Sequence, residues 1–176
     1  GEATFNSRVG IKSAPDLGAG LHVKVSDSGG SVNGNYDTVV IEESGHSGIA
    51  ILSGTSSAGL IGFGDSGAAL RGYFSYNHSS DSIEIATAEA ERMRIDGSGL
   101  IGIGNTTASS FDAGANRMVL GTGSGNNGLT IYAQNNASSS IHFADGSSGN
   151  ASYRGYLQYS HSSDALILAT GATEVI

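Results

Sequence analysis

The stretch that decides the fold is residues 71–87, RGYFSYNHSSDSIEIAT, which returns as residues 154–170, RGYLQYSHSSDALILAT. Ten of the 17 positions are identical at an offset of 83 residues. Further upstream, residues 61–65 (IGFGD) match residues 141–145 (IHFAD) at an offset of 80. Self-similarity over this length indicates that the chain consists of two copies of one β-rich module.

The matches also predict where each module begins and ends. Residues 9–11 match residues 101–103 at an offset of 92, so the first module carries about a dozen residues, around 21–35, that the second lacks. We therefore assign the first module to residues 1–99 and the second to residues 100–176. The second copy stops opposite a run that continues as a strand in the first, and we expect the sequence to be part of a longer chain.

Local pattern predicts an all-β protein. Short apolar or alternating runs recur roughly every 10 residues, and Gly, Ser, Asn or Asp separate them nearly every time. Only residues 86–94 have a helical composition, which their counterpart in the second copy does not share, so we predict strand or loop there. The predicted strands are 38–41, 49–52, 60–63, 70–76, 83–86, 93–95, 100–103, 118–120, 129–132, 141–143, 153–159 and 165–169.

Composition excludes several classes of function. The chain has 176 residues, of which 28 are Gly, and it has no Cys, which excludes disulfide scaffolds, Cys-ligated zinc and thiol nucleophiles. Its net charge of −8, with only eight Lys and Arg, is unsuited to binding nucleic acid or anionic membrane. No apolar run approaches the ~20 residues of a membrane span. Nothing in the sequence predicts a cofactor or a metal site.

The predicted strands carry too few large apolar residues to build an ordinary hydrophobic core. Most offer two or three large apolar residues, often with Gly between them, and a module of ~80 residues buries only a modest share of its surface. Two solutions exist for thin repeated β modules: a single-chain solenoid, or several copies whose apolar faces meet. Solenoid rungs repeat every ~20–30 residues, much less than this period. The pattern therefore favours an elongated oligomer of interwound chains.

Two motifs resemble repeats found in bacteriophage tail fibres. One is residues 91–104, ERMRIDGSGLIGIG, and the other is residues 143–159, FADGSSGNASYRGYLQY. The resemblance covers nearly the whole chain and implies a homotrimeric, elongated, β-rich fibre on a virion, often followed by a self-cleaving intramolecular chaperone domain. Residues 104–108 lack the Pro that commonly follows this turn, and residues 21–35 form an insertion relative to the pattern.

The function that the resemblance implies is a non-catalytic shaft or spacer that supports attachment to a host receptor. Its partners would be its own copies, other virion tail proteins and, through a distal tip, a host surface glycan or protein. Two alternatives stay open: a tailspike-like glycan depolymerase, and a bacterial surface adhesin or filament built from the same modules. A prophage-derived or cellular filament would carry the same sequence signals.

Several motifs imitate active sites. Residues 62–67 and 123–128 satisfy G-x-G-x-x-G, but each precedes a predicted strand, whereas dinucleotide binding needs a helix there. Residues 64–67 (GDSG) resemble a serine protease segment, but the second copy moves the Ser by one position. His-Ser-Ser-Asp occurs twice, ending at Asp81 and Asp164, which favours a hairpin turn over a metal or catalytic site.

Two pairs of neighbouring acidic residues are candidates for a catalytic pair. Glu42 and Glu43 would point to opposite faces of a strand. Glu89 and Glu91, with Arg92 and Arg94 nearby, are interpreted as a solvated charge cluster rather than as the acid and base of a glycosidase.

One recurring cation is predicted to set strand register. An Arg begins each R-G-Y-x-x-Y run, with carboxylates close by in sequence. We expect each Arg to pair with one of these carboxylates and to hold the strands in register, because a one-residue slip would reverse the faces of every side chain. The residues are Arg71 with Asp65 or Asp81, and Arg154 with Asp145 or Asp164.

Overall fold

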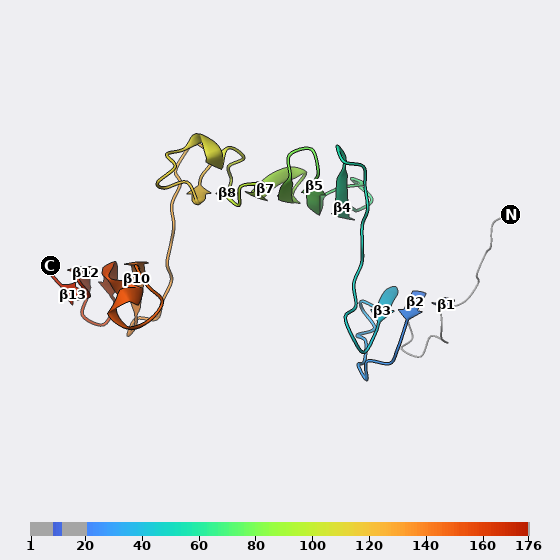
Figure 1. Ribbon diagram of the computed structural model, residues 1–176, viewed down its shortest axis with the longest axis horizontal. Coiled ribbons are helices and arrows are strands. Elements are labelled where there is room, and N and C mark those ends of the chain that lie inside the picture. Colours follow the sequence, from blue (N-terminus) through green and yellow to red (C-terminus); the bar gives the residue numbers. More distant parts are fainter. Residues whose placement is uncertain (1–8, 12–20, 176) are drawn as a thin grey trace. The chain divides into compact units, whose positions relative to one another are not determined.

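The computed structural model describes residues 9–11 and 21–175, and within them the protein is all-β, as predicted (Figure 1). The described part has thirteen strands and two short 3₁₀ helices, and no α-helix. Contacts divide the chain into two compact units, residues 1–81 and residues 82–176, which are described separately below.

The first unit begins with a small parallel sheet. Its strands are β1 (Val9–Ile11), β2 (Leu21–Lys24) and β3 (Val39–Glu42), in the order β1-β2-β3. β2 belongs to the residues 21–35 that the sequence marks as an insertion. The insertion therefore supplies the central strand of this sheet.

The first unit also contains the hairpin of β4 (Ala58–Phe63) and β5 (Gly72–Asn77), which pair antiparallel. The loop between them turns sharply at Gly64. A Cβ at this position would collide with the carbonyl oxygen of Ala69, so only glycine allows the backbone to approach so closely.

In the second unit the first strands are β6 (Ser82–Thr87), β7 (Ala90–Ile95), β8 (Ile101–Ile103) and β9 (Met118–Leu120). They follow one another in sheet order, antiparallel except for the parallel pair β8–β9. Ala88 and Glu89, between β6 and β7, both have positive φ, as a tight two-residue hairpin turn requires. Residues 86–94, for which the sequence left strand or loop open, therefore form strand with a tight turn.

The second unit ends in an antiparallel sheet. It contains β10 (Ser138–Phe143), β11 (Gly155–Ser160), β12 (Ala165–Thr170) and the short β13 (Thr173–Glu174), in that order. The 3₁₀ helix η2 (Gly149–Tyr153) lies in the connection between β10 and β11, and η1 (Ala108–Ser110) lies in the connection between β8 and β9.

Two predicted strands are not strands in the structure. Residues 49–52 and 129–132 precede β4 and β10, and no strand of the described chain pairs with them. Their apolar sequences suit a strand, but a β-strand also needs a neighbour to complete its backbone hydrogen bonds. Figure 1 draws both segments as plain trace between strands.

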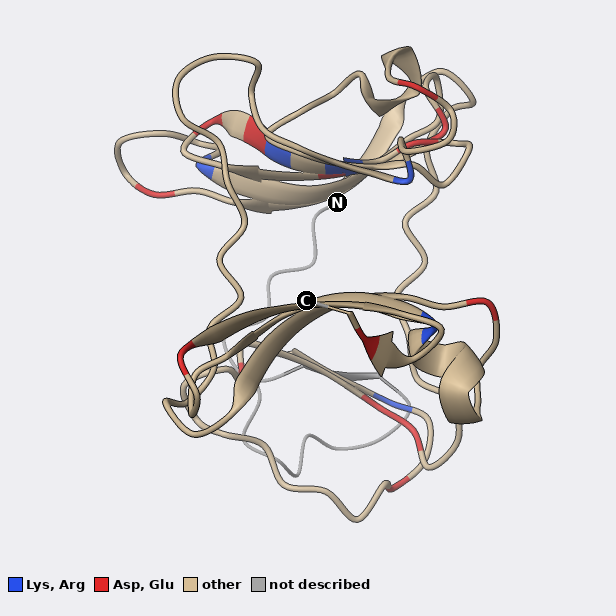
Figure 2. Cartoon of the chain, turned by 90° about the vertical axis from the view of Figure 1, so that its left-hand side faces the viewer, with Lys and Arg blue, Asp and Glu red and all other residues tan. Residues whose placement is uncertain are grey.

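The described residues bury very little apolar material. Leu100 is the one large apolar side chain that is buried, together with three alanines, Ala86, Ala108 and Ala169. Polar residues outnumber these among the buried side chains. Charged residues are also sparse, and long stretches of the chain in Figure 2 carry none.

The outer faces of the strands carry the large apolar residues instead. In β12 the inward positions are Ala165, Ile167 and Ala169, whereas Leu166 and Leu168 point outward and are exposed. Two of the three large apolar residues of β12 therefore lie on its exposed face, although large apolar side chains usually face the core.

Candidate functional site

A polar cluster is buried in the parallel sheet of the first unit. His22 and Lys24 are two residues apart on β2 and so share one face of the sheet. The register sets Lys24 beside Glu42 of β3, and His22 beside Val40. His22 is 0% exposed and Glu42 is 4% exposed, so these groups are removed from water.

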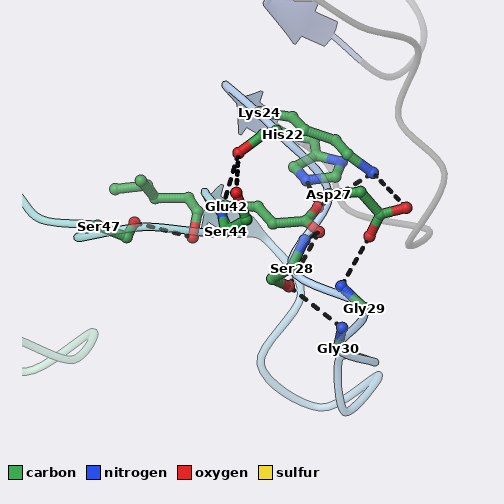
Figure 3. A network of polar contacts seen from close by, with 11 residues as sticks. His22, Lys24, Asp27, Ser28, Gly29, Gly30, Glu42, Ser44 and Ser47 are labelled. Atoms are coloured by element: carbon green, nitrogen blue, oxygen red, sulfur yellow. Dashed lines mark hydrogen bonds and ion pairs between the residues drawn. The ribbon is translucent and has the colours of Figure 1, made fainter.

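The carboxylate of Glu42 is the centre of this cluster (Figure 3). Its Oε2 lies 2.8 Å from Nε2 of His22 and 3.4 Å from Nζ of Lys24. Its Oε1 accepts hydrogen bonds from the backbone N–H of Ser28 at 2.8 Å and from the Ser28 hydroxyl at 3.0 Å. Both carboxylate oxygens are therefore occupied by groups of the chain itself.

These contacts stabilise the charged form of Glu42. The backbone N–H of Ser28 is the largest cause, and the Ser28 hydroxyl, His22 and Lys24 add to it against the effect of burial. Together they lower the pKa of Glu42 from 4.5 to about 2. A carboxylate that stays ionised and has both oxygens occupied is unsuited to act as a general acid or a nucleophile.

The loop that follows β2 is tied to the same cluster. Asp27 accepts a hydrogen bond from the backbone N–H of Gly29 at 2.8 Å and lies 3.8 Å from Nζ of Lys24. The hydroxyl of Ser26 accepts a hydrogen bond from the N–H of Ser44 at 2.9 Å, joining the ends of β2 and β3. These bonds hold the start of the inserted segment against the sheet.

Sequence reasoning missed this cluster. Its members lie about 20 residues apart, and no motif connects them. The available signal was the alternation of His22 and Lys24 with Leu21 and Val23, which placed two polar residues on one face of a strand.

A second cluster joins β6 and β7. The guanidinium of Arg94 lies 2.7 Å from Glu91 and 3.0 Å from Glu84, and it donates to the hydroxyl of Ser82 at 3.1 Å. The side chains of all three charged residues are at most about one-fifth exposed. The interpretation of Glu91 and Arg94 as part of a solvated cluster is therefore wrong. The pairing of β6 with β7 sets Glu84 beside Arg94, and the three side chains are largely shielded from water.

The arginines predicted to set register lie beside carboxylates. Nε of Arg71 is 3.1 Å from Oδ2 of Asp65, and Nε of Arg154 is 3.2 Å from Oδ2 of Asp145. These side chains are about half exposed, which makes the pairs surface pairs. A role in register stays a prediction.

Asp65 also closes its own turn. Its Oδ1 accepts the backbone N–H groups of Gly67 at 2.7 Å and Ala68 at 2.9 Å. These two bonds, with Arg71 third, lower the pKa of Asp65. The GDSG segment at residues 64–67 is thus part of an Asx-type turn, and Asp65 is engaged in holding it.

The other two carboxylates of the register set have different partners. The hydroxyl of Tyr76 donates to Asp81, and the hydroxyl of Tyr159 donates to Asp164. In each case the hydrogen bond raises the pKa of the tyrosine. Both aspartates have φ near +51°, which Asp tolerates in turns better than most residues.

A histidine ring packs on each of these tyrosines. The ring centroids of Tyr76 and His78 are 5.0 Å apart in an edge-to-face arrangement, and those of Tyr159 and His161 are also 5.0 Å apart. The His-Ser-Ser-Asp segments therefore fold back on the preceding tyrosine, which agrees with their interpretation as turns.

One open cavity of about 780 Å³ lies in the second unit. The lining contains aromatic and neutral hydrogen-bonding groups and no carboxylate, so it lacks the pair of acids that glycoside hydrolysis uses. No group of three or more His, Asp or Glu suited to a metal ion occurs in the described residues. The lining residues are Thr130, Ile131, Tyr132, Ala133, Gln134, Asn135, Asn136 and His161.

Within residues 9–11 and 21–175, no helix is long and apolar enough to cross a membrane. No protein-family model, no curated protein and no solved structure matches this chain.

Proposed function

We propose that this chain is a structural segment of a bacteriophage tail fibre, a homotrimeric shaft or spacer that supports attachment of the virion to its host. In this proposal the segment is built from two copies of one module, works outside the cell as part of the virion and has no catalytic role. The sequence motifs supply the link to tail fibres, and the structure supplies the physical argument for assembly.

The observation that carries the proposal is the apolar outer face of the sheet β10-β11-β12. The register sets Ile141 beside Leu157, and Leu157 beside Leu168, in one row across the three strands. Side chains two residues further along each strand share that face. All six are exposed in the single chain, namely Ile141, Phe143, Leu157, Tyr159, Leu166 and Leu168.

The hairpin β4–β5 has a face of the same kind. Ile61 lies opposite Phe74, and Phe63 and Tyr76 share their face of the hairpin. All four side chains are exposed. Contiguous apolar faces of this kind mark interaction surfaces in soluble proteins. Copies of the same chain are the partner that supplies a matching apolar face at every module.

The polar groups that resemble catalytic residues already make hydrogen bonds or ion pairs within the chain. Glu42, Asp65 and Arg94 hold strands and turns, and the tyrosine–aspartate pairs close hairpin turns. This distribution supports a structural role over a glycan depolymerase. Incubation with capsular or lipopolysaccharide glycans should release no reducing ends. Release that disappears on replacing Asp81 or Glu91 would contradict the proposal.

The decisive experiment measures the mass of the purified chain in solution by sedimentation and light scattering. We expect a trimer, and a stable folded monomer would overturn the proposal. Leu168→Asp places a charge on the outer apolar face and should weaken assembly. Ser162→Asp adds the same charge in an exposed turn and should leave the trimer intact. Equal effects of the two variants would argue against this face as the interface.

A further inference from the structure

Two apolar segments of the chain lack a strand partner. They are residues 49–52, Ile-Ala-Ile-Leu, and residues 129–132, Leu-Thr-Ile-Tyr, and a glycine precedes each. Within the described residues, no backbone–backbone hydrogen bond reaches either segment. Leu52 is 92% exposed and Tyr132 is 95% exposed. Each of the two segments therefore combines a strand-like sequence, a backbone without ladder hydrogen bonds and exposed apolar side chains.

Each segment contacts the strand that follows it. The hydroxyl of Ser139 donates to the carbonyl oxygen of Ile131 at 2.9 Å. In the other segment, a Cβ placed on Gly59 would lie 3.1 Å from the side chain of Ile51. These contacts anchor each segment near the start of β4 or β10 without pairing its backbone to that strand.

The strands β4 and β10 are the other half of the argument. Each is the first strand of its sheet and has a ladder partner on one side only. Many proteins protect such edges from pairing with other chains by placing Pro, Lys or another charged residue in the edge strand. The sequences of β4 (AGLIGF) and β10 (SSSIHF) contain none of these residues. An edge without protection is a template for a strand from another chain.

The distribution of charge also favours contact between copies at these segments and edges. Residues 44–64 and 118–144 contain no Asp, Glu, Lys or Arg, although the whole chain carries −8. Identical acidic chains repel one another, so they approach most easily where they are uncharged. These two runs contain both unpaired segments and both unprotected edges.

We propose that residues 49–52 and 129–132 are interchain strands, each of which adds to the edge of β4 or β10, respectively, in a neighbouring copy. This inference rests on the trimer of the proposed function. Each copy then donates one strand and receives one strand at each module. Such head-to-tail exchange closes into a ring, in which the open edge of β4 and of β10 is covered in every copy.

Hydrogen exchange followed by mass spectrometry tests the inference on the assembled wild-type chain. Alternate amides of 49–52 and 129–132 should exchange at least about tenfold more slowly than in free peptides of the same sequence. Successive N–H groups of a strand point to opposite sides, so every second amide donates to the neighbouring chain. If the protein sediments as a trimer and these amides exchange like free peptides, the inference fails and the proposed function stands. If the protein is a monomer, the proposed function fails first.

Proline substitutions provide a second test. Thr130→Pro and Ile131→Pro are made separately, because successive N–H groups of a strand point to opposite sides and one of the two variants removes a donor to the neighbouring copy. Asn135→Pro is the matched control, because Asn135 follows Gln134 in a turn closed by the Ala137 N–H and the Gln134 carbonyl, where Pro is favoured. At least one of the two segment variants should dissociate at a higher protein concentration than wild type, whereas Asn135→Pro should not. Unchanged assembly of both Thr130→Pro and Ile131→Pro would overturn the inference.

Discussion

Nε2 of His22 lies 2.8 Å from Oε2 of Glu42, across two neighbouring parallel strands and inside a sheet that has almost no apolar core. The contact connects the inserted strand β2 to β3 through a side chain as well as through the backbone ladder. Because β2 lies between β1 and β3, the strength of this contact bears on the whole sheet.

Glu42→Gln should destabilise the first unit. The substitution keeps the size of the side chain but leaves Lys24 without its buried counter-charge, and loss of one partner of a buried pair is strongly destabilising. We expect the melting temperature of the first unit to fall by roughly 5 °C or more. Glu43→Gln, next in sequence and outside the cluster, is the control and should melt like wild type.

Acid should destabilise the protein through the same carboxylate. The pKa of Glu42 is about 2 in the folded chain, below its ordinary value of 4.5, so the unfolded chain takes up the proton first as the pH falls. The stabilisation is therefore complete above about pH 5 and declines between about pH 5 and pH 2. Urea unfolding across this range should show a weaker pH dependence in Glu42→Gln than in wild type, and identical profiles would contradict this assignment.

The Arg154–Asp145 pair should have a small effect on stability. Its side chains are 53% and 58% exposed, and exposed pairs contribute only ~0–1 kcal/mol. Arg154→Ala should therefore lower the melting temperature by a few degrees at most, and salt should reduce the difference. If the pair fixes register, Arg154→Ala will also weaken assembly more than Arg154→Lys does. If both variants melt and assemble like wild type, Arg154 contributes to neither stability nor register.

The turn at Asp164 should depend on its left-handed backbone. Asp164→Val places a β-branched side chain at φ near +51° and removes the acceptor of the Tyr159 hydroxyl. The conformation alone costs about 1–2 kcal/mol for such a residue. Asp164→Asn keeps an acceptor oxygen and tolerates this backbone, so thermal melting should separate the two variants clearly. Equal melting temperatures would show that the turn is indifferent to this position.

The two tyrosines that donate hydrogen bonds to aspartates should ionise at a higher pH than an ordinary tyrosine. The hydrogen bond to the neighbouring aspartate raises the pKa of Tyr76 and Tyr159. In a spectrophotometric titration of the folded protein, Tyr159→Phe should remove a component from the high-pH end of the tyrosine transition. Asp164→Asn should move the Tyr159 component to lower pH, because it removes the charged acceptor of the Tyr159 hydroxyl.

Local sequence determined much of the β structure. Alternating apolar residues and turn residues placed most strands, because a strand's side-chain period and a turn's backbone requirements are local properties. The His-Ser-Ser-Asp turns were predicted for the same reason. The predicted strands at 49–52 and 129–132 do not form within the single chain, because a strand exists only where a second strand completes its hydrogen bonds, and local pattern does not contain that partner.

Tertiary structure alone decided which residues meet in the polar clusters and which face of each strand is exposed. His22, Lys24 and Glu42 meet because β2 pairs with β3 in one register, and Glu84 joins Arg94 because β6 pairs with β7. Sequence spacing does not encode either meeting, since the residues come from different strands. The outward position of Leu168 was equally hidden, because alternation shows that a strand has two faces but not which face the rest of the chain covers.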